Sequence, residues 1–439
     1  MAKPKLALIP AAQGDKFYSV LPSSGVGDFD FTRSGGATRI NSQGLIETVA
    51  DGVSRLNYPL IDGKVVGCPS HLLEPQRLQK IQYSEDFSQG YWTKTGASVT
   101  SGFTSPKGDL NASKLNILNT VNESKYLNSS IITVGGGTAT IVTTQMFVKK
   151  GEVSIVGLSD GHYNYGWVVA DLTNGSVISV GGTGYISNSI TLLANDWYLI
   201  SLTFTTHSTG TYKATCSLLD GSYVSGNPKT YTSIGVIGFG VYVYGFQAEV
   251  GSYPTSYIPN YGTAAGITRS AETANGAGDA STFNDSEGVL MAEISALADD
   301  GTARAISISD GGSSDYIQLR YHSVSNTVRF IVNSGGSTNF DYFITLPSTL
   351  DSNKIAIKYN NTNVYLWANG IEYFQFSPIT TPIGLSELAF DDGSGANDFY
   401  GNTKQIQYFD SALNDSDLEK LTSWVSFSDM ANGQLYTIE

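Results

Sequence analysis

The chain has 439 residues, a formal net charge of −14 and only 15% charged residues, while Gly (48) and Tyr (26) are abundant. Such an acidic chain lacks the dense Lys and Arg surface that a phosphate backbone requires, so we expect no binding to nucleic acid. No stretch approaches the roughly 20 apolar residues of a membrane helix, and the apolar run after Lys5 is too short for a signal peptide, so we expect synthesis in the cytoplasm and no membrane insertion.

The length and composition together predict several sheet domains. Single hydrophobic cores stop growing near roughly 250 to 300 residues, and residues such as Gly, Ser, Thr, Asn and Tyr are typical of twisted sheets joined by tight turns. We predict an all-β fold with two antiparallel β-sandwich (jelly-roll) domains after a small irregular N-terminal docking region, and one short C-terminal helix. The predicted boundaries are 1-75 for the docking or oligomerisation region, 76-262 for the first sandwich, 263-282 for a linker and 283-439 for the second sandwich.

Residues 1-75 carry turn signals such as Pro22-Ser23-Ser24-Gly25 and Ser34-Gly35-Gly36, with only short apolar runs between them. A region of this kind buries little by itself, whereas ordering its backbone costs about 1 to 2 kcal/mol per residue. We therefore expect it to pack against another subunit or another protein.

Strands follow in quick succession in the first sandwich. Residues 139–148 and 197–204 alternate larger apolar with smaller or polar side chains, the period of a half-buried strand. Asn174-Gly175 lies between two apolar runs and predicts a hairpin, because an Asn-Gly pair readily takes the positive φ angles of a type I′ turn.

The second sandwich begins after a small, polar stretch at 262–279. Asn369-Gly370 predicts another hairpin between 363–368 and 371–374. Near the end, Asn414 can cap a helix whose buried stripe is Leu418, Leu421 and Val425.

Several segments resemble virion proteins of tailed bacteriophages. The start of those proteins resembles Phe31-Thr32-Arg33-Ser34, Ala37-Thr38-Arg39-Ile40-Asn41 and Gly44-Leu45-Ile46-Glu47. In those proteins a recurring segment joins a short N-terminal region to a carbohydrate-binding-module-like sandwich. That segment resembles Leu72-Leu73-Glu74-Pro75-Gln76-Arg77, Tyr83-Ser84-Glu85-Asp86-Phe87 and Trp92-Thr93-Lys94 of this chain. The closing strand of that sandwich resembles Gln247-Ala248-Glu249 and 251–259. The second sandwich is similar to the concanavalin A or laminin-G type of jelly roll.

The resemblance implies a virion structural protein, a tail or head fibre or spike, that presents lectin-like modules to host-surface polysaccharide. It implies attachment to other virion proteins, capsid or tail, through residues 1-75, and association as a homotrimer. A capsid decoration or head-fibre protein with a purely structural role would use the same modules and is the alternative.

Enzymatic signals are weak, so we expect no catalytic residues. The four histidines, His71, His162, His207 and His322, have no metal-ligand spacing, and no Ser lies in a Gly-x-Ser-x-Gly elbow that opens a helix. A glycosidase needs only two facing carboxylates, which leaves a polysaccharide depolymerase as a second alternative.

Aromatic residues near loops are the candidate glycan-binding residues, because flat apolar rings can stack on sugars. They are Tyr163, Tyr165 and Trp167 in the first sandwich and Tyr316, Tyr321 and Tyr342 in the second. Packing in a core or a subunit interface is the alternative for both clusters.

No cofactor is expected, with one possible exception for calcium. Asp391, Asp392, Asn397 and Asp398 lie in a Gly-rich loop and offer the oxygen ligands that Ca²⁺ prefers. Asp and Asn in such turns also bond their own backbone, which is the competing interpretation.

Overall fold

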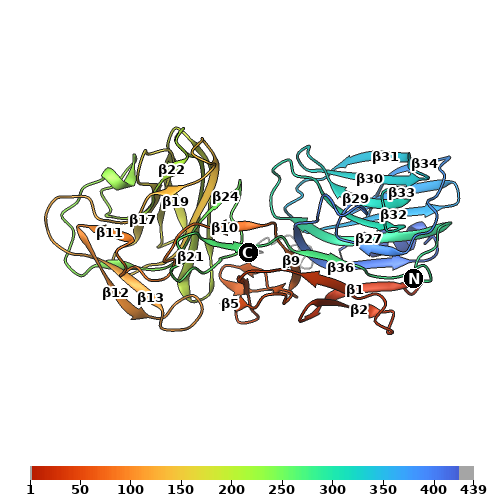
Figure 1. Ribbon diagram of the computed structural model, residues 1–439, viewed down its shortest axis with the longest axis horizontal. Helices are drawn as coiled ribbons and strands as arrows, with labels where there is room; N and C mark the ends of the chain where they lie inside the picture. The colour runs from red at the N-terminus through yellow and green to blue at the C-terminus, as the bar shows by residue number, and fades with distance from the viewer. Residues whose placement is uncertain (1, 425–439) are drawn as a thin grey trace.

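Two β-sandwiches lie side by side along the long axis of the molecule, and the N-terminal strands run beneath the second sandwich and the junction between the two (Figure 1). The computed structural model describes residues 2–424. Nearly all regular structure in these residues is antiparallel sheet, and the one α-helix follows the last strand. The all-β prediction is therefore confirmed.

The first sandwich consists of two six-stranded sheets, which we call the front sheet and the back sheet. The front sheet has the order β11 (Trp92–Thr95), β14 (Tyr126–Ser129), β23 (Ala214–Leu219), β17 (Ile155–Asp160), β18 (Trp167–Asp171), β19 (Ser176–Gly181). The back sheet has the order β12 (Ala97–Phe103), β13 (Ala112–Ile117), β24 (Gly240–Val250), β16 (Ile141–Lys149), β21 (Trp197–Thr205), β20 (Tyr185–Leu192). Between the sheets, Leu158, Phe204 and Val243 are fully buried in one core.

The second sandwich pairs a five-stranded sheet with a larger one. The smaller sheet has the order β31 (Ser337–Thr345), β30 (Thr327–Ser334), β29 (Tyr316–Tyr321), β28 (Arg304–Ser309), β35 (Glu387–Ala389). The larger has the order β26 (Thr273–Asn275), β3 (Phe29–Thr32), β2 (Lys16–Leu21), β1 (Leu6–Gln13), β36 (Gly401–Phe409), β27 (Glu287–Ala296), β32 (Asn353–Asn360), β33 (Asn363–Ala368), β34 (Ile371–Phe376). β9 (Ser70–Leu73) also pairs with β36, and β6 (Leu56–Asn57) pairs with β9.

Short two-stranded pairings complete the sheets. They are β4 (Ala37–Ile40) with β5 (Ile46–Val49), β7 (Leu60–Ile61) with β8 (Lys64–Val65), β10 (Arg77–Gln79) with β25 (Ile267–Arg269), and β15 (Ile132–Thr133) with β22 (Thr211–Tyr212).

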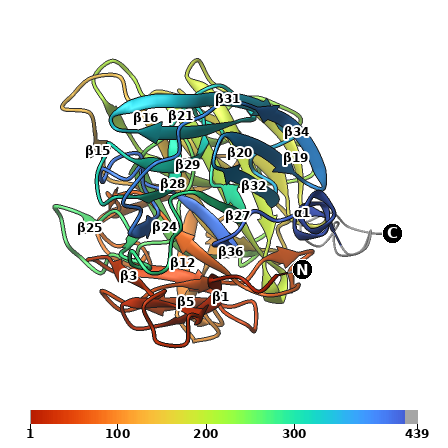
Figure 2. The same cartoon turned by 90° about the vertical axis from the view of Figure 1, so that its right-hand side faces the viewer.

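The N-terminal region is ordered by its own chain, which differs from the expectation that it would need another subunit. β1 pairs with β36, with Leu6 opposite Tyr408, so the first strands extend the sheet of the second sandwich. Phe17 and Phe29 are fully buried in that core. Figure 2 shows these strands along the lower side of the sandwich. The pairing joins residues about as far apart as the chain allows, so no local pattern could indicate it.

The segment expected to be a linker, 263-282, is also part of the sheets. β25 pairs with β10, and β26 pairs with β3. Both strands are only three residues long and lie in a small, polar sequence, so their composition resembles that of a loop.

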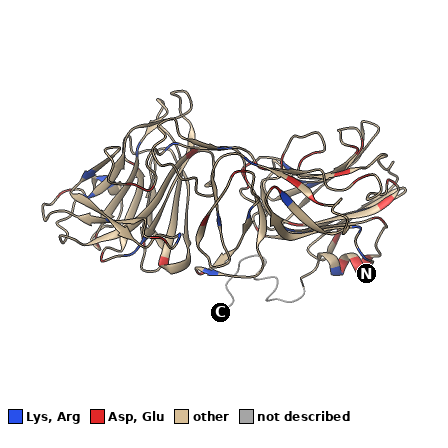
Figure 3. Cartoon of the chain, turned by 60° about the horizontal axis from the view of Figure 1, so that its bottom comes forward, with Lys and Arg blue, Asp and Glu red and all other residues tan. Residues whose placement is uncertain are grey.

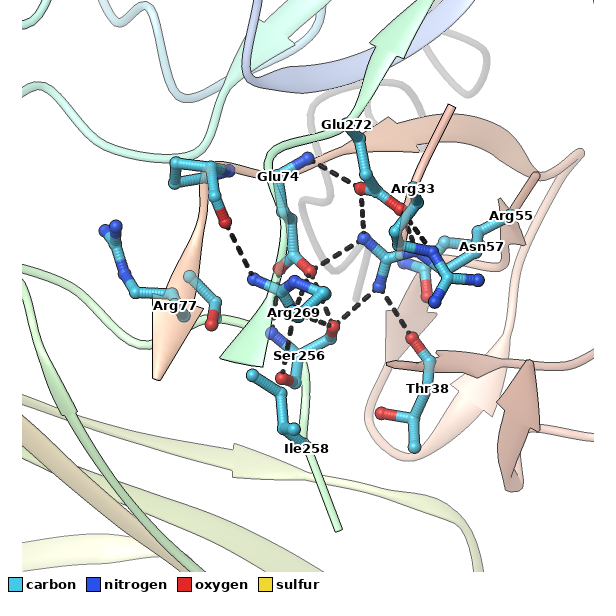
Figure 4. Close-up of polar contacts among 12 residues, drawn as sticks. Arg33, Thr38, Arg55, Asn57, Glu74, Arg77, Ser256, Ile258, Arg269 and Glu272 are labelled. Carbon is cyan, nitrogen blue, oxygen red and sulfur yellow. Dashed lines mark hydrogen bonds and ion pairs between the residues drawn. The ribbon is translucent and has the colours of Figure 1, made fainter. Parts of the chain in front are cut away.

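Five buried charged residues form a junction network between the N-terminal region and the two sandwiches (Figure 4). Arg55 lies 2.8 Å from Glu74, and Arg269 lies 2.7 Å from the same carboxylate oxygen. Arg33 and Arg55 both pair with Glu272, the former at 3.1 Å. All five side chains are 4% exposed or less.

The segments that carry the phage resemblance meet at this network. Arg33 comes from the first of them, Glu74 from the second, and the closing segment contributes Ser256, whose backbone N–H donates to Glu74 at 2.7 Å. Their shared location assigns these motif residues a structural role at the junction.

The predicted turns and helix are present, with one difference. Asn369 and Gly370 both have positive φ, 49° and 84°, and Ala368 pairs directly with Ile371, as a type I′ turn requires. At the other hairpin Asp171 pairs with Ser176, so the loop takes in residues 172–175, and of the Asn-Gly pair only Gly175 has positive φ.

The C-terminal helix α1 (Asp415–Thr422) begins as predicted. The Asn414 side chain accepts a hydrogen bond from the Asp417 N–H at 2.9 Å. Leu418 and Leu421 pack with Leu413 against the outer face of the larger sheet. Val425, the third predicted member of the stripe, lies outside the described residues.

Charged residues are sparse along the fold. Figure 3 shows Lys and Arg as short, separate segments of a ribbon in which uncharged residues predominate. Within residues 2–424, no helix has the length and apolarity that crossing a bilayer requires.

Candidate functional site

A polar pocket of about 440 Å³ lies at one end of the front sheet; we call it the front pocket. Its walls come from β11, β14, the loop 161–166 between β17 and β18, and the short 3-10 helix η2 (Pro228–Thr230). The lining residues are Thr95, Ser124, Tyr126, Asp160, Gly161, His162, Asn164, Asn227, Lys229 and Thr230. The volume falls in the range of small-molecule pockets, about 300 to 1,000 Å³.

The strand register makes the outer face of the front sheet polar beside this pocket. Directly paired residues point to the same face of a sheet, and the residues between them, such as Leu127 and Leu158, fill the core. Two adjacent rows face outward: Asn128, Thr215, Ser159 and Trp167, and beside them Tyr126, Ser217 and Gly157. The hydroxyl groups of Thr215, Ser159 and Ser217 therefore lie between the Tyr126 ring on one side and the Trp167 ring on the other.

Gly157 allows η2 to close over this face. A Cβ atom at Gly157 would lie 2.4 Å from the Cβ of Pro228, a distance that no real contact allows. The Asn227 side chain accepts the Lys229 N–H at 3.0 Å and so fixes the start of η2. Close packing at Gly157 thus sets the position of Lys229 above the sheet.

Asp160 shapes the loop opposite η2. Its buried carboxylate accepts the backbone N–H groups of His162 at 2.9 Å and of Tyr163, Tyr165 and Lys213 at 3.2 Å each. The side chain is 1% exposed. With four backbone donors around it, this carboxylate positions the loop and has little capacity left for a ligand.

Lys229 is half-buried at the pocket wall. Its ammonium group lies 5.4 Å from the centre of the Tyr126 ring and donates a hydrogen bond to the Gly161 carbonyl. A cation over an aromatic face is held electrostatically by the ring. Among residues 2–424, no carboxylate oxygen lies within 4.0 Å of this ammonium group.

Four buried polar atoms at or beside the front pocket have no hydrogen-bond partner among the described residues. They are Asn164 Oδ1, Ser159 Oγ, Ser217 Oγ and Trp167 Nε1. An unsatisfied buried polar group costs about 1 to 3 kcal/mol, and native folds leave few of them without water or a ligand. Of these four residues, Asn164 belongs to the lining of the front pocket, so its Oδ1 is the acceptor nearest to a ligand there.

The first predicted aromatic cluster lies beside the pocket rather than inside it. Tyr163 is 40% exposed, and its ring stacks on His207 with centroids 4.1 Å apart. Tyr165 meets the same imidazole edge-on, and Trp167 lies in the outward row of the front sheet. The predicted residues Tyr163 and Tyr165 belong to the loop 161–166, which contributes Gly161, His162 and Asn164 to the pocket lining instead.

The pocket also contains residues that the sequence analysis missed, Tyr126, Asn227 and Lys229. They come from two other parts of the chain, and each lies in an unremarkable local sequence. Only the order of strands in the front sheet brings them together.

The second predicted cluster does not form one site. Tyr321 is 3% exposed in the core, and its hydroxyl donates to the Ile294 carbonyl at 2.9 Å, so its assignment as a glycan-binding residue is wrong. Side chains alternate between the two faces of a strand, so Tyr321 points into the core together with Ile317 and Leu319 of β29. Tyr316 is half-buried on the opposite face, and Tyr342 stacks on Phe374 at 3.8 Å.

The candidate calcium loop uses its oxygens in its own turn. Asp392 accepts hydrogen bonds from the Ser394 N–H at 3.0 Å and from Asn397 Nδ2 at 2.7 Å. Asp391 accepts from the Gly393 N–H at 2.7 Å, and Asp398 accepts from the Tyr400 hydroxyl at 2.9 Å. Within residues 2–424, no group of three or more His, Cys, Asp or Glu residues is placed to hold a metal.

The protonation of this loop follows the same contacts. Burial raises the pKa of Asp391 and of Asp398. Burial alone would also raise the pKa of Asp392, but hydrogen bonds from Ser394 and Asn397 outweigh it and lower that pKa. The arrangement supports the turn interpretation over the calcium interpretation.

A second cavity of about 360 Å³ lies between the N-terminal region and the back sheet. Its walls are mainly apolar, with Ile40, Ile46 and Leu199 among them, and two of its polar members, Glu74 and Ser256, bond each other. A sugar presents hydroxyl groups around its ring, so the front pocket, whose lining is mainly polar, suits it better.

Comparison with protein-family models finds no match for the sequence, and comparison with curated proteins finds none either. Solved structures give low likenesses. The CBM40 module of the Ruminococcus gnavus IT-sialidase, bound to α2,3-sialyllactose, is 17% identical over 34% of this chain and 87% of that chain, with a TM-score of 0.29.

Two further structures show the same level of likeness. Domain 4 of AbnA, a GH43 extracellular arabinanase from Geobacillus stearothermophilus in complex with arabinotriose, is 14% identical over 35% of this chain and 73% of that chain, with a TM-score of 0.29. Domains LG4-5 of the mouse laminin α1 chain are 10% identical over 67% of this chain and 90% of that chain, with a TM-score of 0.22. All three TM-scores lie below 0.5, so function is argued from the site itself.

Proposed function

We propose that this chain is a non-enzymatic glycan-binding protein and that the front pocket is its glycan site. The observation that carries the proposal is the combination of a polar pocket, the Tyr126 ring in its wall and unpartnered buried acceptors such as Asn164 Oδ1. Aromatic rings offer sugars a flat apolar face, and fixed polar groups select hydroxyl positions. The Asp160 carboxylate, saturated by backbone donors, is not free to act as an acid or base.

The proposed setting is a tailed-phage virion, in which the chain forms a fibre or spike that attaches to host polysaccharide. The support is the sequence resemblance, whose segments contribute Arg33, Glu74 and Ser256 to one junction. Attachment would use the outer face of β1 and β2, where Ile9 (43% exposed) and Val20 (49%) leave apolar surface uncovered. In a homotrimer, several weak glycan sites would bind the same surface together, which raises the overall affinity.

A glycan array probed with the full chain tests the binding proposal. We expect retention of a defined set of bacterial glycans, and a loss of about tenfold or more in affinity for Tyr126→Ala, because a stacked ring contributes about 0.5 to 1.5 kcal/mol beyond its buried area. Tyr342→Ala, a half-buried tyrosine in the second sandwich, is the matched control and should bind normally. If Tyr342→Ala alone abolished binding, the site would belong to the second sandwich.

The virion setting and the absence of catalysis have separate tests. Gold-labelled antibodies against this chain should decorate phage particles in electron micrographs, on the tail for a host-attachment fibre and on the head for a decoration protein. Unlabelled particles would contradict the virion proposal. Purified protein incubated with capsular polysaccharide should release no reducing ends, whereas their release would identify a depolymerase.

A further inference from the structure

The charge of Lys229 is unusual for its surroundings. The chain carries a net charge of −14, yet no carboxylate of residues 2–424 lies within 4.0 Å of this ammonium group. A half-buried ammonium loses part of its hydration, and a protein normally compensates it with an anion. Here the Tyr126 ring and the Gly161 carbonyl hold the group in place without neutralising it.

The ammonium also retains hydrogen-bonding capacity. It has three N–H donors, and within the described part of the chain its one contact with an oxygen acceptor is that to Gly161. The buried carboxylate of the same pocket lining, Asp160, already accepts four backbone N–H groups. Besides Tyr126, the pocket wall also contains the exposed imidazole of His162.

On the basis of the proposed function, we propose that the front pocket selects acidic sugars and that Lys229 binds their carboxylate. The sugar carboxylate accepts hydrogen bonds from the free N–H donors of Lys229. A sugar hydroxyl donates to Asn164 Oδ1, the buried acceptor that lacks a partner. The ligand class is thus a glycan that contains a uronate or another carboxylated sugar.

The geometry favours a carboxylated over a neutral glycan for a physical reason. A neutral sugar would leave the Lys229 charge partly desolvated and unpaired, whereas a carboxylate forms a charge-assisted hydrogen bond of about 1.5 to 3 kcal/mol. That difference corresponds to about 10- to 100-fold in affinity. The pre-positioned ammonium also reduces the entropy lost on binding.

Isothermal titration of the full chain with matched oligosaccharides tests the inference. The probes are oligogalacturonate, oligoguluronate and hyaluronan fragments, each compared with its carboxyl-reduced form, which keeps the ring, the linkage and the other hydroxyls. We expect at least one acidic member to bind about 10- to 100-fold more tightly than its reduced counterpart. Raising the salt concentration should narrow the difference, because salt screens the ion pair.

Variants assign the selectivity to the proposed group. Lys229→Gln should abolish the preference for the acidic member, and Lys229→Arg, which keeps the cation, should restore part of it. Lys150→Gln removes a lysine charge elsewhere on the same sandwich, where its side chain donates to the Thr173 hydroxyl, and should change nothing. Equal melting temperatures of the variants would show that the fold is intact.

The outcomes separate this inference from the proposed function. Equal binding of acidic and reduced members, or an acidic preference that survives Lys229→Gln, would overturn the selectivity and leave glycan binding in place. If no matched pair binds but the array identifies a neutral glycan that depends on Tyr126, the selectivity alone is overturned. If no glycan is retained in either experiment, both proposals are wrong.

Discussion

Arg269 Nη1 and Glu74 Oε2 lie 2.7 Å apart, with both side chains 4% exposed or less. Glu74 follows β9, and Arg269 ends β25, so the pair joins segments on either side of the whole first sandwich. Burying two charges in this way is costly unless each remains paired, which makes the junction sensitive to the loss of one partner.

We predict that Glu74→Gln destabilises the protein by about 3 to 5 kcal/mol, the usual cost of leaving a buried charge uncompensated. Arg55 and Arg269 would both lose their ion pair to this carboxylate. Urea denaturation followed by tryptophan fluorescence measures the change. Glu47→Gln, which breaks the more exposed pair with Arg39, is the control and should cost at most about 1 kcal/mol. Equal losses for the two variants would refute the role of burial.

The buried imidazole of His71 should lower the free energy of unfolding of the protein in mild acid. It is fully buried, stacks on Phe17 at 3.9 Å and donates to the Ile9 carbonyl at 3.1 Å. Burial lowers its pKa to about 4. The unfolded chain takes up this proton near pH 6.5 and the folded chain only near pH 4, so unfolding is favoured progressively as pH falls between these values, by about 3 kcal/mol in total.

The measurement for His71 is the free energy of unfolding at a series of pH values. Above pH 6.5 the full stability should be present. The variant His71→Gln keeps a donor for Ile9 but does not titrate, so its stability should vary less between pH 6.5 and 4. An unchanged pH profile in this variant would assign the acid sensitivity to other groups.

Gly157→Ala should impair the front pocket more than the fold. The added Cβ would meet Pro228 and displace η2, and with it Lys229. We expect glycan affinity to fall about tenfold or more, with a loss of stability of about 1 to 3 kcal/mol, as for other overpacked sites. Gly221→Ala, at a position where a Cβ meets nothing within 4 Å, is the control in the same covering loop. If Gly157→Ala bound glycan normally, η2 would not be part of the binding site.

Calcium should have little effect on this protein. The carboxylates of Asp391, Asp392 and Asp398 already accept hydrogen bonds within their loop. A site saturated at 100 times its dissociation constant would add about 2.7 kcal/mol of stability, which a melting curve detects readily. We expect equal melting temperatures in millimolar calcium and in EDTA. A clear rise with calcium would revive the binding interpretation of the loop.

Local chemistry in the sequence determined much of the fold. The all-β class follows from composition and from period-two alternation, the cap at Asn414 follows from its side-chain oxygen, and the turn at Asn369-Gly370 follows from the positive φ that this pair tolerates. Each of these features depends on residues within a few positions of one another. The predicted residues Tyr163, Tyr165 and Trp167 lie beside the front pocket, and their role in glycan binding stays a prediction.

Tertiary structure alone decided where distant segments meet. Asn174-Gly175 carries the same turn signal as Asn369-Gly370, yet the pairing of Asp171 with Ser176 imposes a longer loop. The partner of β1 is β36, and the wall of the front pocket takes Tyr126 and Lys229 from separate strands and turns. The backbone groups at a sheet edge can pair with a strand of almost any sequence. Packing of the whole core therefore decides which strands pair, and no single stretch of sequence encodes that choice.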